Sequence, residues 1–309
     1  MTDDQSHEHP TSEHPTSAQH YDVVVVGGGP AGLQATLTLA RVHRRVLMLD
    51  SGRYRNDPAG HMHNVVTHDG TPPATFRAAA RADLAAYATV TVRDAAASSV
   101  TAEHGGFRVR IGEESVTSRG VVLATGVRDT LPDKPGLAGL FGDVAAHCPF
   151  CHGHEFSGKH VGILGVAGAG HLPGLVGPIA SRVTVFTDGA ALEADLPAGV
   201  AVRTEPVRGF EPTGSGARVC LDGGPDEEVG GLFVTTTFDQ SAPFAEQLGL
   251  TLLPSGCVEV DALGRTSLPG VHAAGDMAHL AALPMPMASV LTAAASGQVA
   301  AAAMVQHLL

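Results

Sequence analysis

The sequence has few cysteines, no long apolar run and a shortage of positive charge, and each of these excludes a class of protein. Four cysteines in 309 residues are too few for a disulfide-stabilised scaffold. No apolar stretch reaches the length of a membrane span and the N-terminus has no signal-peptide core, so we expect a cytoplasmic chain that does not enter a membrane. Acidic residues outnumber basic ones by 31 to 19, and the net charge of −12 argues against nucleic acid or an anionic membrane as the main partner.

The length and composition predict a folded chain with two domains. At 309 residues the chain exceeds the size at which one hydrophobic core usually suffices. Hydrophobic residues make up 44% of the chain and charged residues only 16%, as in globular rather than disordered proteins. Residues 1–20 differ from the rest because they are polar and contain EHPTS twice, which predicts a disordered tail.

A glycine-rich turn between an apolar strand and a helix begins the ordered part of the chain. Val23–Val26 form a continuous apolar run, as in parallel strands buried on both faces, and a helix is expected over about 30–43. In the pattern G-x-G-x-x-G the first glycine permits the tight turn, the second admits a pyrophosphate close to the backbone, and the third lets the helix pack on the strand. The next strand ends at Asp50, where a carboxylate can accept hydrogen bonds from ribose hydroxyls. The segment therefore predicts a dinucleotide site that contains Gly27, Gly29, Pro30, Ala31, Gly32 and Asp50.

A second turn of the same kind, Gly165–Gly170, lacks features that a nicotinamide cofactor needs. Ala167 occupies the slot of the second glycine, so its methyl group obstructs the approach of a pyrophosphate. No arginine occurs between Arg182 and Arg203 to bind the 2′-phosphate of NADPH, and Asp188 would repel that phosphate. Two interpretations stay open: an NADH site with Asp188 on the ribose, or a fold that persists without a working nicotinamide site. We favour the second.

Two of the four cysteines lie in the segment His147–Glu155, which has the sequence HCPFCHGHE. A structural zinc site needs four ligands, and no second C-x-x-C occurs elsewhere to supply them. An inert disulfide is disfavoured in a reducing compartment. A C-x-x-C at the start of a helix instead lowers the pKa of one thiol and gives a thiolate that can exchange disulfides or attack a flavin. The segment therefore favours a redox centre, with no metal, at Cys148 and Cys151.

The histidines of this segment are candidates for proton transfer. His152 directly follows the second cysteine, and the ordinary pKa of histidine, about 6.5, suits acid–base work near neutrality. Glu155 is placed to orient His152 or His154, although a surface carboxylate in a salt bridge is an equally good interpretation.

The chain resembles the low-molecular-weight thioredoxin reductases over nearly all of residues 20–309. Besides the first glycine turn and the C-x-x-C, it contains SLPGVHAAGD, which is similar to the second FAD motif of flavoprotein disulfide reductases, and an ATG element. The resemblance implies an α/β fold with two doubly wound, Rossmann-like domains, FAD as cofactor, and a homodimer. It divides the chain into an FAD-binding domain in two parts, 21–130 and 245–309, and an inserted NAD(P)-binding-like domain, 131–244, that carries the C-x-x-C. It adds Thr125, Gly126, Gly275 and Asp276 to the FAD site, with Asp276 on the ribityl chain.

Within that family the chain is similar to the FAD-dependent dithiol oxidases that close disulfides in natural products of the gliotoxin and holomycin type. HCPFCHGHE together with GHMHNVVTHDGTPP carries this resemblance. It implies that a small-molecule dithiol passes electrons through the cysteines and FAD to O2, which becomes H2O2. Cys151 would be the thiolate that faces the flavin and Cys148 the thiol that forms a mixed disulfide with substrate. His61 and His63 would lie at the substrate pocket and Asn64 near the flavin, although hydrogen bonding within the loop explains these three residues equally well.

Two other functions stay open at this point. One keeps the fold and reverses the electron flow, giving a disulfide reductase that takes electrons from NAD(P)H or another donor. The other is a non-catalytic regulator that binds flavin or zinc.

Overall fold

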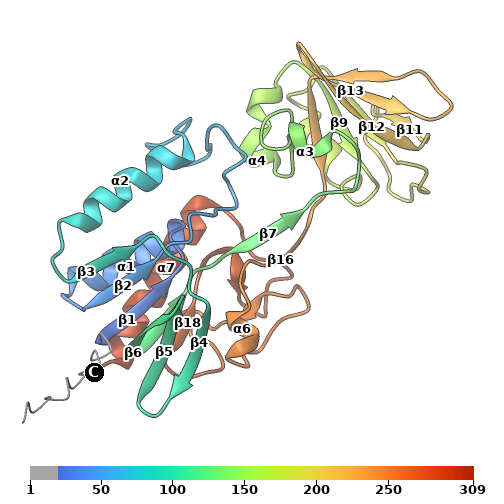
Figure 1. Ribbon diagram of the computed structural model, residues 1–309. Helices are drawn as coiled ribbons and strands as arrows, with labels where there is room; N and C mark the ends of the chain where they lie inside the picture. Colours follow the sequence, from blue (N-terminus) through green and yellow to red (C-terminus); the bar gives the residue numbers. More distant parts are fainter. Residues whose placement is uncertain (1–19) are drawn as a thin grey trace, which may run out of the picture.

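The computed structural model describes residues 20–309. The segment that we predict to be a disordered tail lies outside this range, apart from His20, which begins the first strand. In the described part of the chain two main sheets form two bodies, and a two-stranded ribbon connects them (Figure 1). The second sheet is parallel, and the first is parallel except for β5 (Gly106–Ile111) and β4 (Ser99–Glu103), which pair antiparallel at one edge. The predicted α/β architecture with two Rossmann-like sheets is confirmed.

The first sheet combines strands from both ends of the sequence. Its apolar strands are buried on both faces, as the run Val23–Val26 predicts. The late strand β18 pairs in parallel with β6, so the C-terminal segment completes a sheet that the N-terminal segment begins. In spatial order the strands are β3 (Val90–Arg93), β2 (Val46–Leu49), β1 (His20–Val26), β6 (Glu114–Leu123), β5 (Gly106–Ile111) and β4 (Ser99–Glu103), with β18 (Val271–Ala273) beside β6.

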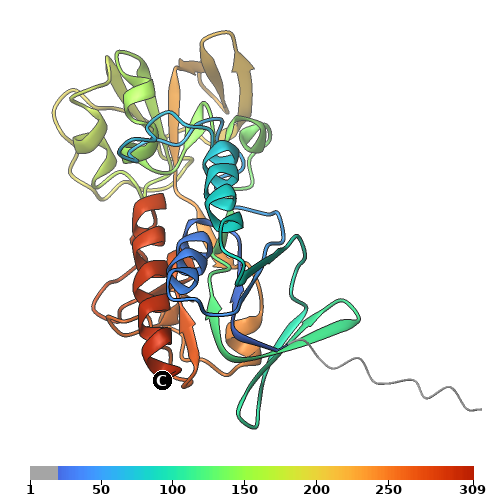
Figure 2. The same cartoon turned by 90° about the vertical axis from the view of Figure 1, so that its left-hand side faces the viewer.

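Helices α1 (Pro30–Arg41) and α7 (Val290–His307) lie side by side against this sheet, next to α2 (Pro73–Ala85) (Figure 2). The first two approach closely because Gly297 has no side chain: a Cβ there would lie 2.1 Å from the carbonyl oxygen of Ala31. This contact places the start of α1 beside the C-terminal segment.

The ends of both helices follow local rules. Helix α1 ends at Arg41, two residues before the predicted end, and His43 takes a left-handed φ of 55° that stops the helix. Helix α7 begins after Ser289, whose hydroxyl oxygen accepts a hydrogen bond of 3.0 Å from the backbone N–H of Thr292.

The second sheet is parallel and is covered on one face by an antiparallel sheet of three strands. The order of the parallel strands is β11 (Ala201–Arg203), β10 (Arg182–Phe186), β9 (His160–Leu164), β15 (Gly231–Val234) and β8 (Ala145–Ala146). The antiparallel sheet contains β12 (Val207–Thr213), β13 (Gly216–Leu221) and β14 (Glu227–Val229). Apolar side chains of both sheets, among them Phe186, Leu232 and Val219, form the core between them.

The connecting ribbon pairs β7 (Val127–Thr130) with β16 (Thr237–Gln240) in antiparallel register. It carries the chain from the first body into the second and back (Figure 1). The remaining short elements are α3 (Leu137–Leu140), α4 (Pro149–His152), η1 (His154–Phe156), α5 (Leu172–Val176), α6 (Phe244–Gln247), β17 (Val258–Glu259), η2 (Gly275–Met277) and β19 (Ala278–His279). Within residues 20–309 no helix is both long enough and apolar enough to cross a bilayer.

Candidate active site

The first glycine turn has the open backbone that a pyrophosphate needs. Gly27 has a φ of 120°, and a Cβ there would lie 2.2 Å from the carbonyl oxygen of Ala124. A Cβ at Gly32 would lie 1.8 Å from the carbonyl oxygen of Gly27, so the helix can pack against the turn only if residue 32 is glycine. A Cβ at Gly29 would meet no atom within 4 Å, which leaves free space in front of the start of α1. The three glycines therefore have the geometry that the motif predicts, and their contact with a pyrophosphate stays a prediction.

Asp50 follows strand β2 directly and is held beside this turn. Its side chain is buried, and its carboxylate accepts hydrogen bonds from the backbone N–H of Gly52 at 2.9 Å and from the hydroxyl of Tyr54 at 2.7 Å. Gly28 makes room for it, because a Cβ at Gly28 would lie 2.0 Å from Asp50 Oδ2. Burial and the neighbouring carboxylate raise the pKa of Tyr54 to about 12, so this phenol stays a donor. Sequence reasoning missed Gly28 and Tyr54, although the middle glycine of the GGG run was a visible signal.

The later cofactor residues converge on the same turn. The backbone N–H of Thr125 lies 3.3 Å from the sulfur of Met277, and Gly126 has a φ of 66°. A Cβ at Gly275 would lie 3.0 Å from the Cβ of Ala31, at the start of α1. The structure thus brings together the predicted residues Gly27, Gly29, Pro30, Ala31, Gly32, Asp50, Thr125, Gly126, Gly275 and Asp276 from three distant parts of the sequence.

The two cysteines of the CPFC sequence lie at the start of the short helix α4. Cys148 is its N-cap residue, Pro149 its first residue, and the two sulfur atoms lie 2.8 Å apart, with the Cys151 thiol donating to Cys148. Both side chains are partly exposed, as a centre that exchanges disulfides with a substrate requires. Phe150 between them is 68% exposed.

The surroundings of the pair favour a thiolate at Cys148. The hydrogen bond from Cys151, the backbone N–H groups of Cys151 and Phe150 and the charge of Arg55 lower the pKa of Cys148 to about 6, against the opposing effect of burial. The hydrogen bond to Cys148 and burial raise the pKa of Cys151. In this conformation the thiolate character therefore lies on Cys148, whereas the resemblance assigns the flavin-facing thiolate to Cys151. The separate roles of the two cysteines stay predictions.

His152, at the end of α4, is suited to accept a proton. Burial lowers its pKa, against a backbone hydrogen bond at Gly142 and the charge of Glu155, so the imidazole is neutral at pH 7. Its Nδ1 atom is buried and has no hydrogen-bond partner among residues 20–309. A neutral ring with one unused nitrogen beside the cysteines has the chemistry of a general base.

Glu155 lies within ion-pair distance of His63, a partner that the sequence did not predict. Its Oε1 atom lies 3.5 Å from Nε2 of His63, whose Nδ1 atom lies 3.7 Å from Asp69 Oδ2. The pair joins the segment after the cysteines to the loop between β2 and α2, so His63 does lie beside the candidate site. His61, Asn64 and His154 are exposed, and their roles stay predictions.

The second glycine turn differs from the first in the way that the sequence suggests. Ala167 is exposed at the position that corresponds to Gly29. The backbone N–H groups of Ala169 and Leu172 are bonded to carbonyl oxygens within the turn. The helix that follows, α5, has only five residues, against twelve in α1, and so offers a phosphate a much weaker dipole.

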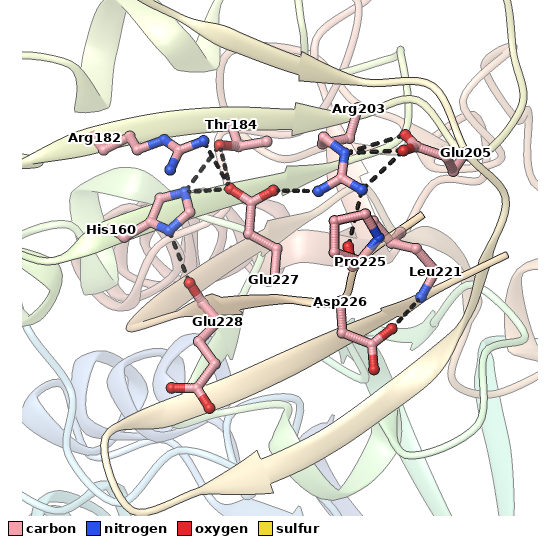
Figure 3. A network of polar contacts seen from close by, with 10 residues as sticks. All are labelled: His160, Arg182, Thr184, Arg203, Glu205, Leu221, Pro225, Asp226, Glu227 and Glu228. Atoms are coloured by element: carbon pink, nitrogen blue, oxygen red, sulfur yellow. Dashed lines mark hydrogen bonds and ion pairs between the residues drawn. The ribbon is translucent and has the colours of Figure 1, made fainter. Parts of the chain in front are cut away.

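Neither charged residue at the ends of the next two strands is free to bind a ribose or its phosphate. The carboxylate of Asp188 lies 2.7 Å from the ammonium of Lys134 and accepts a hydrogen bond of 2.7 Å from the backbone N–H of Val207. Arg203 is held by Glu205 and Glu227, each at 2.8 Å (Figure 3). Asp188 and Arg203 therefore each bind charged partners within the protein.

The network around Arg203 has a structural effect, because it connects two sheets of the second body. Glu227, on β14, forms an ion pair with Arg203 on β11, and its Oε1 atom lies 3.5 Å from Nε2 of His160 on β9 (Figure 3). These polar contacts join the three-stranded sheet to the parallel one. In residues 20–309 no three histidine, cysteine or acidic side chains are grouped as a metal site would require, which gives the zinc alternative no ligand set there.

Arg55 is the main residue of the site that the sequence did not indicate. Its guanidinium binds Asp129 through two nitrogens, at 2.7 and 2.8 Å, and Asp276 through the third, at 2.8 Å. These partners are 74 and 221 residues away in the sequence, so no local pattern predicts the contact.

The family model, the sequence relatives and the solved structures all indicate that the chain is similar to disulfide oxidoreductases. The sequence model of the family described as pyridine nucleotide-disulphide oxidoreductase matches residues 21–171 and 188–302. Thioredoxin reductase sirT of Leptosphaeria maculans is 33% identical to this chain, over 90% of this chain and 91% of its own length. Thioredoxin reductase aclD of Aspergillus oryzae is 35% identical, over 84% of this chain and 89% of its own length. The crystal structure of an oxidoreductase from Agrobacterium tumefaciens covers 93% of this chain and 98% of its own, with 30% identity and a TM-score of 0.84. The crystal structure of HlmI covers 94% of this chain and 92% of its own, with 31% identity and a TM-score of 0.82.

Two alanine substitutions in the first turn separate cofactor binding from folding. Gly29→Ala places a methyl group in free space and in an allowed backbone conformation, so the apoprotein should keep its melting temperature. FAD binding, measured by fluorescence titration, should weaken at least about tenfold, or about 1.4 kcal/mol. Gly32→Ala should instead destabilise the apoprotein, because its Cβ overlaps the backbone of Gly27. Unchanged FAD affinity in Gly29→Ala would mean that the pyrophosphate does not pass this turn.

The reactivity of Cys148 should report its lowered pKa. Because a thiolate forms as the pH rises through the pKa, the rate of Cys148 alkylation by iodoacetamide should rise around pH 6 rather than about 8.5 and then level off. Cys151→Ala removes the hydrogen-bond donor, so it should move the midpoint upward. Cys220→Ala, on the distant strand β13, is the control that leaves the profile unchanged. A wild-type midpoint near that of a free thiol would contradict the assignment.

Proposed function

Because this chain belongs to the pyridine nucleotide-disulphide oxidoreductase family, in which it resembles the thioredoxin reductases, we propose that it is a dithiol oxidase that uses O2. The proposed reaction converts a small-molecule dithiol and O2 into the cyclic disulfide and H2O2. Disulfide oxidoreductase chemistry and FAD as cofactor follow from membership of the family. The acceptor O2, the natural-product substrate, a homodimeric assembly and a cytoplasmic location are parts of the proposal.

The residues present fit FAD. The free space at Gly29 and the dipole of α1 suit the pyrophosphate, and Asp50 would hold the adenosine ribose. Asp276 would bind the ribityl chain, in the loop that also meets the start of α1. When bound, FAD supplies a two-electron carrier between the protein dithiol and the final acceptor.

The thiol chemistry can be derived from the cysteine pair in its disulfide form. A substrate thiolate attacks the sulfur of Cys148, the bond between Cys148 and Cys151 breaks, and the electron pair leaves on Cys151. The second substrate thiolate then attacks the substrate sulfur of the mixed disulfide and expels Cys148. A low pKa makes Cys148 the better leaving group in this second step, which supports its assignment as the residue that binds substrate.

Two protons must leave the substrate during this exchange. His152 is neutral at pH 7 and lies next to Cys151, so we assign it the role of base. His63, held by Glu155 at the edge of the site, is placed to contact the incoming substrate.

The observation that carries the direction of electron flow is the state of the second nucleotide turn. Ala167, the short helix α5, and the internal pairing of Asp188 and Arg203 leave NADPH without the contacts it would need. Without that donor the dithiol is the source of electrons, and O2 is the acceptor we propose. The second candidate function is a disulfide reductase with another donor, which the names of the relatives favour.

Oxygen consumption distinguishes the two functions. The holoenzyme with dithiothreitol in air should consume one O2 and form one H2O2 per disulfide, measured with an oxygen electrode and a peroxidase assay. Without O2, dithiothreitol should bleach the flavin absorbance and NADPH or NADH should not. Cys148→Ser and Cys151→Ser should lower turnover by at least about two orders of magnitude, and Cys220→Ser should not. Rapid bleaching by NADPH in the absence of a dithiol would reject the oxidase and support the reductase.

A further inference from the structure

Arg55 is a largely buried cation placed between two carboxylates. It lies in the loop after β2, and its side chain is 19% exposed. Asp129, which receives two of its nitrogens, is 8% exposed, and Asp276, which receives the third, is 19% exposed. A planar guanidinium with all three nitrogens bonded is fixed in position, since each of its bonds is charge-assisted.

The two partners belong to different parts of the structure. Asp129 lies on β7, a strand of the ribbon that leads to the second body, and it also accepts a hydrogen bond of 2.9 Å from Thr236 just before β16. Asp276 lies in η2, the loop that we assign to FAD. Through Asp129, Arg55 therefore connects both strands of the ribbon to the cofactor loop.

The guanidinium also acts on the cysteine pair by its charge. It contributes to the lowered pKa of Cys148 and opposes the raised pKa of Cys151. The other charged group that acts on the pair is Asp276, which raises the pKa of Cys151. Arg55 is thus the cation that offsets this negative charge where the thiolate forms.

We propose that Arg55 is a positioning residue for the disulfide exchange: by binding both Asp129 and Asp276 it fixes the ribbon that leads to the body of the CPFC turn against the FAD loop, and its positive charge acts on Cys148. The proposal rests on the thiol–disulfide function proposed above, but not on the identity of the electron acceptor. It deepens that function because it explains how a centre in one body stays aligned with a cofactor in the other.

Three variants separate charge, geometry and simple structural support. Arg55→Gln removes the charge, Arg55→Lys keeps the charge but loses the planar three-point contact, and Arg53→Gln changes an exposed arginine two residues away as the control. Folding of each holoenzyme is checked by circular dichroism and thermal melting. The alkylation profile of Cys148 is measured on the reduced protein, without O2 or nicotinamide nucleotide.

The expected results differ between the variants. In Arg55→Gln the alkylation midpoint of Cys148 should rise by about one pH unit, as for the loss of an opposite charge nearby. In Arg55→Lys the midpoint should stay near that of the wild type. Its maximal rate of disulfide exchange with dithiothreitol, followed without O2 by stopped flow, should fall about tenfold or more with little change in the half-saturating concentration. Arg53→Gln should match the wild type in both measurements.

The proposal is overturned if Arg55→Lys keeps the wild-type exchange rate, or if Arg55→Gln folds and keeps the wild-type midpoint. If Arg55→Gln does not fold, Arg55→Lys alone decides, because its exchange rate and its alkylation profile respond to different properties of the side chain. A wild-type enzyme that consumes no O2, combined with the expected results in the variants, would reject the oxidase and leave the role of Arg55 intact.

Discussion

The close contact between the two bodies at the cysteine turn is the constraint on which the rest of the structure depends. Disulfide exchange and electron transfer to a cofactor need reacting atoms at contact distance, yet the cysteines and the first nucleotide turn belong to different sheets. The backbones meet at Gly142, where a Cβ would lie 2.3 Å from the carbonyl oxygen of Pro58. The ribbon β7–β16, the ion pair of His63 with Glu155 and the contacts of Arg55 are arranged around this meeting point.

The two glycine turns show how one local fold can keep or lose a binding site. Both follow a parallel strand and both begin with a glycine at positive φ, Gly27 and Gly165. In the first, the backbone stays open and a long helix begins at once. In the second, a methyl group, internal hydrogen bonds and a five-residue helix remove the features that attract phosphate. The sheet around the second turn is nevertheless well packed, and its charged residues join it to the neighbouring antiparallel sheet. In the proposed function the second body serves to carry the cysteines.

Sequence reasoning recovered the features that obey local rules. The requirement for glycine at 27 and 32 follows from steric overlap within a few residues, and Asp50 follows from its place at the end of a buried strand. The helix start at Cys148 follows from the proline after it. Sequence reasoning missed Arg55, Tyr54 and the contact of Glu155 with His63, because no periodicity or motif connects residues that meet only after folding. The end of α1 was placed two residues too late, since the left-handed turn at His43 leaves no composition signal.

The sequence by itself determined that this chain is an α/β protein with an FAD turn, a cysteine pair with redox chemistry and a weakened second nucleotide turn, since each depends on residues within one strand–turn–helix unit. Only the tertiary structure showed which contacts join the two bodies. That property depends on electrostatic contacts between residues far apart in the chain, such as Arg55 and Asp276 at a separation of 221. Charges interact through space, whereas a sequence pattern records only distance along the chain.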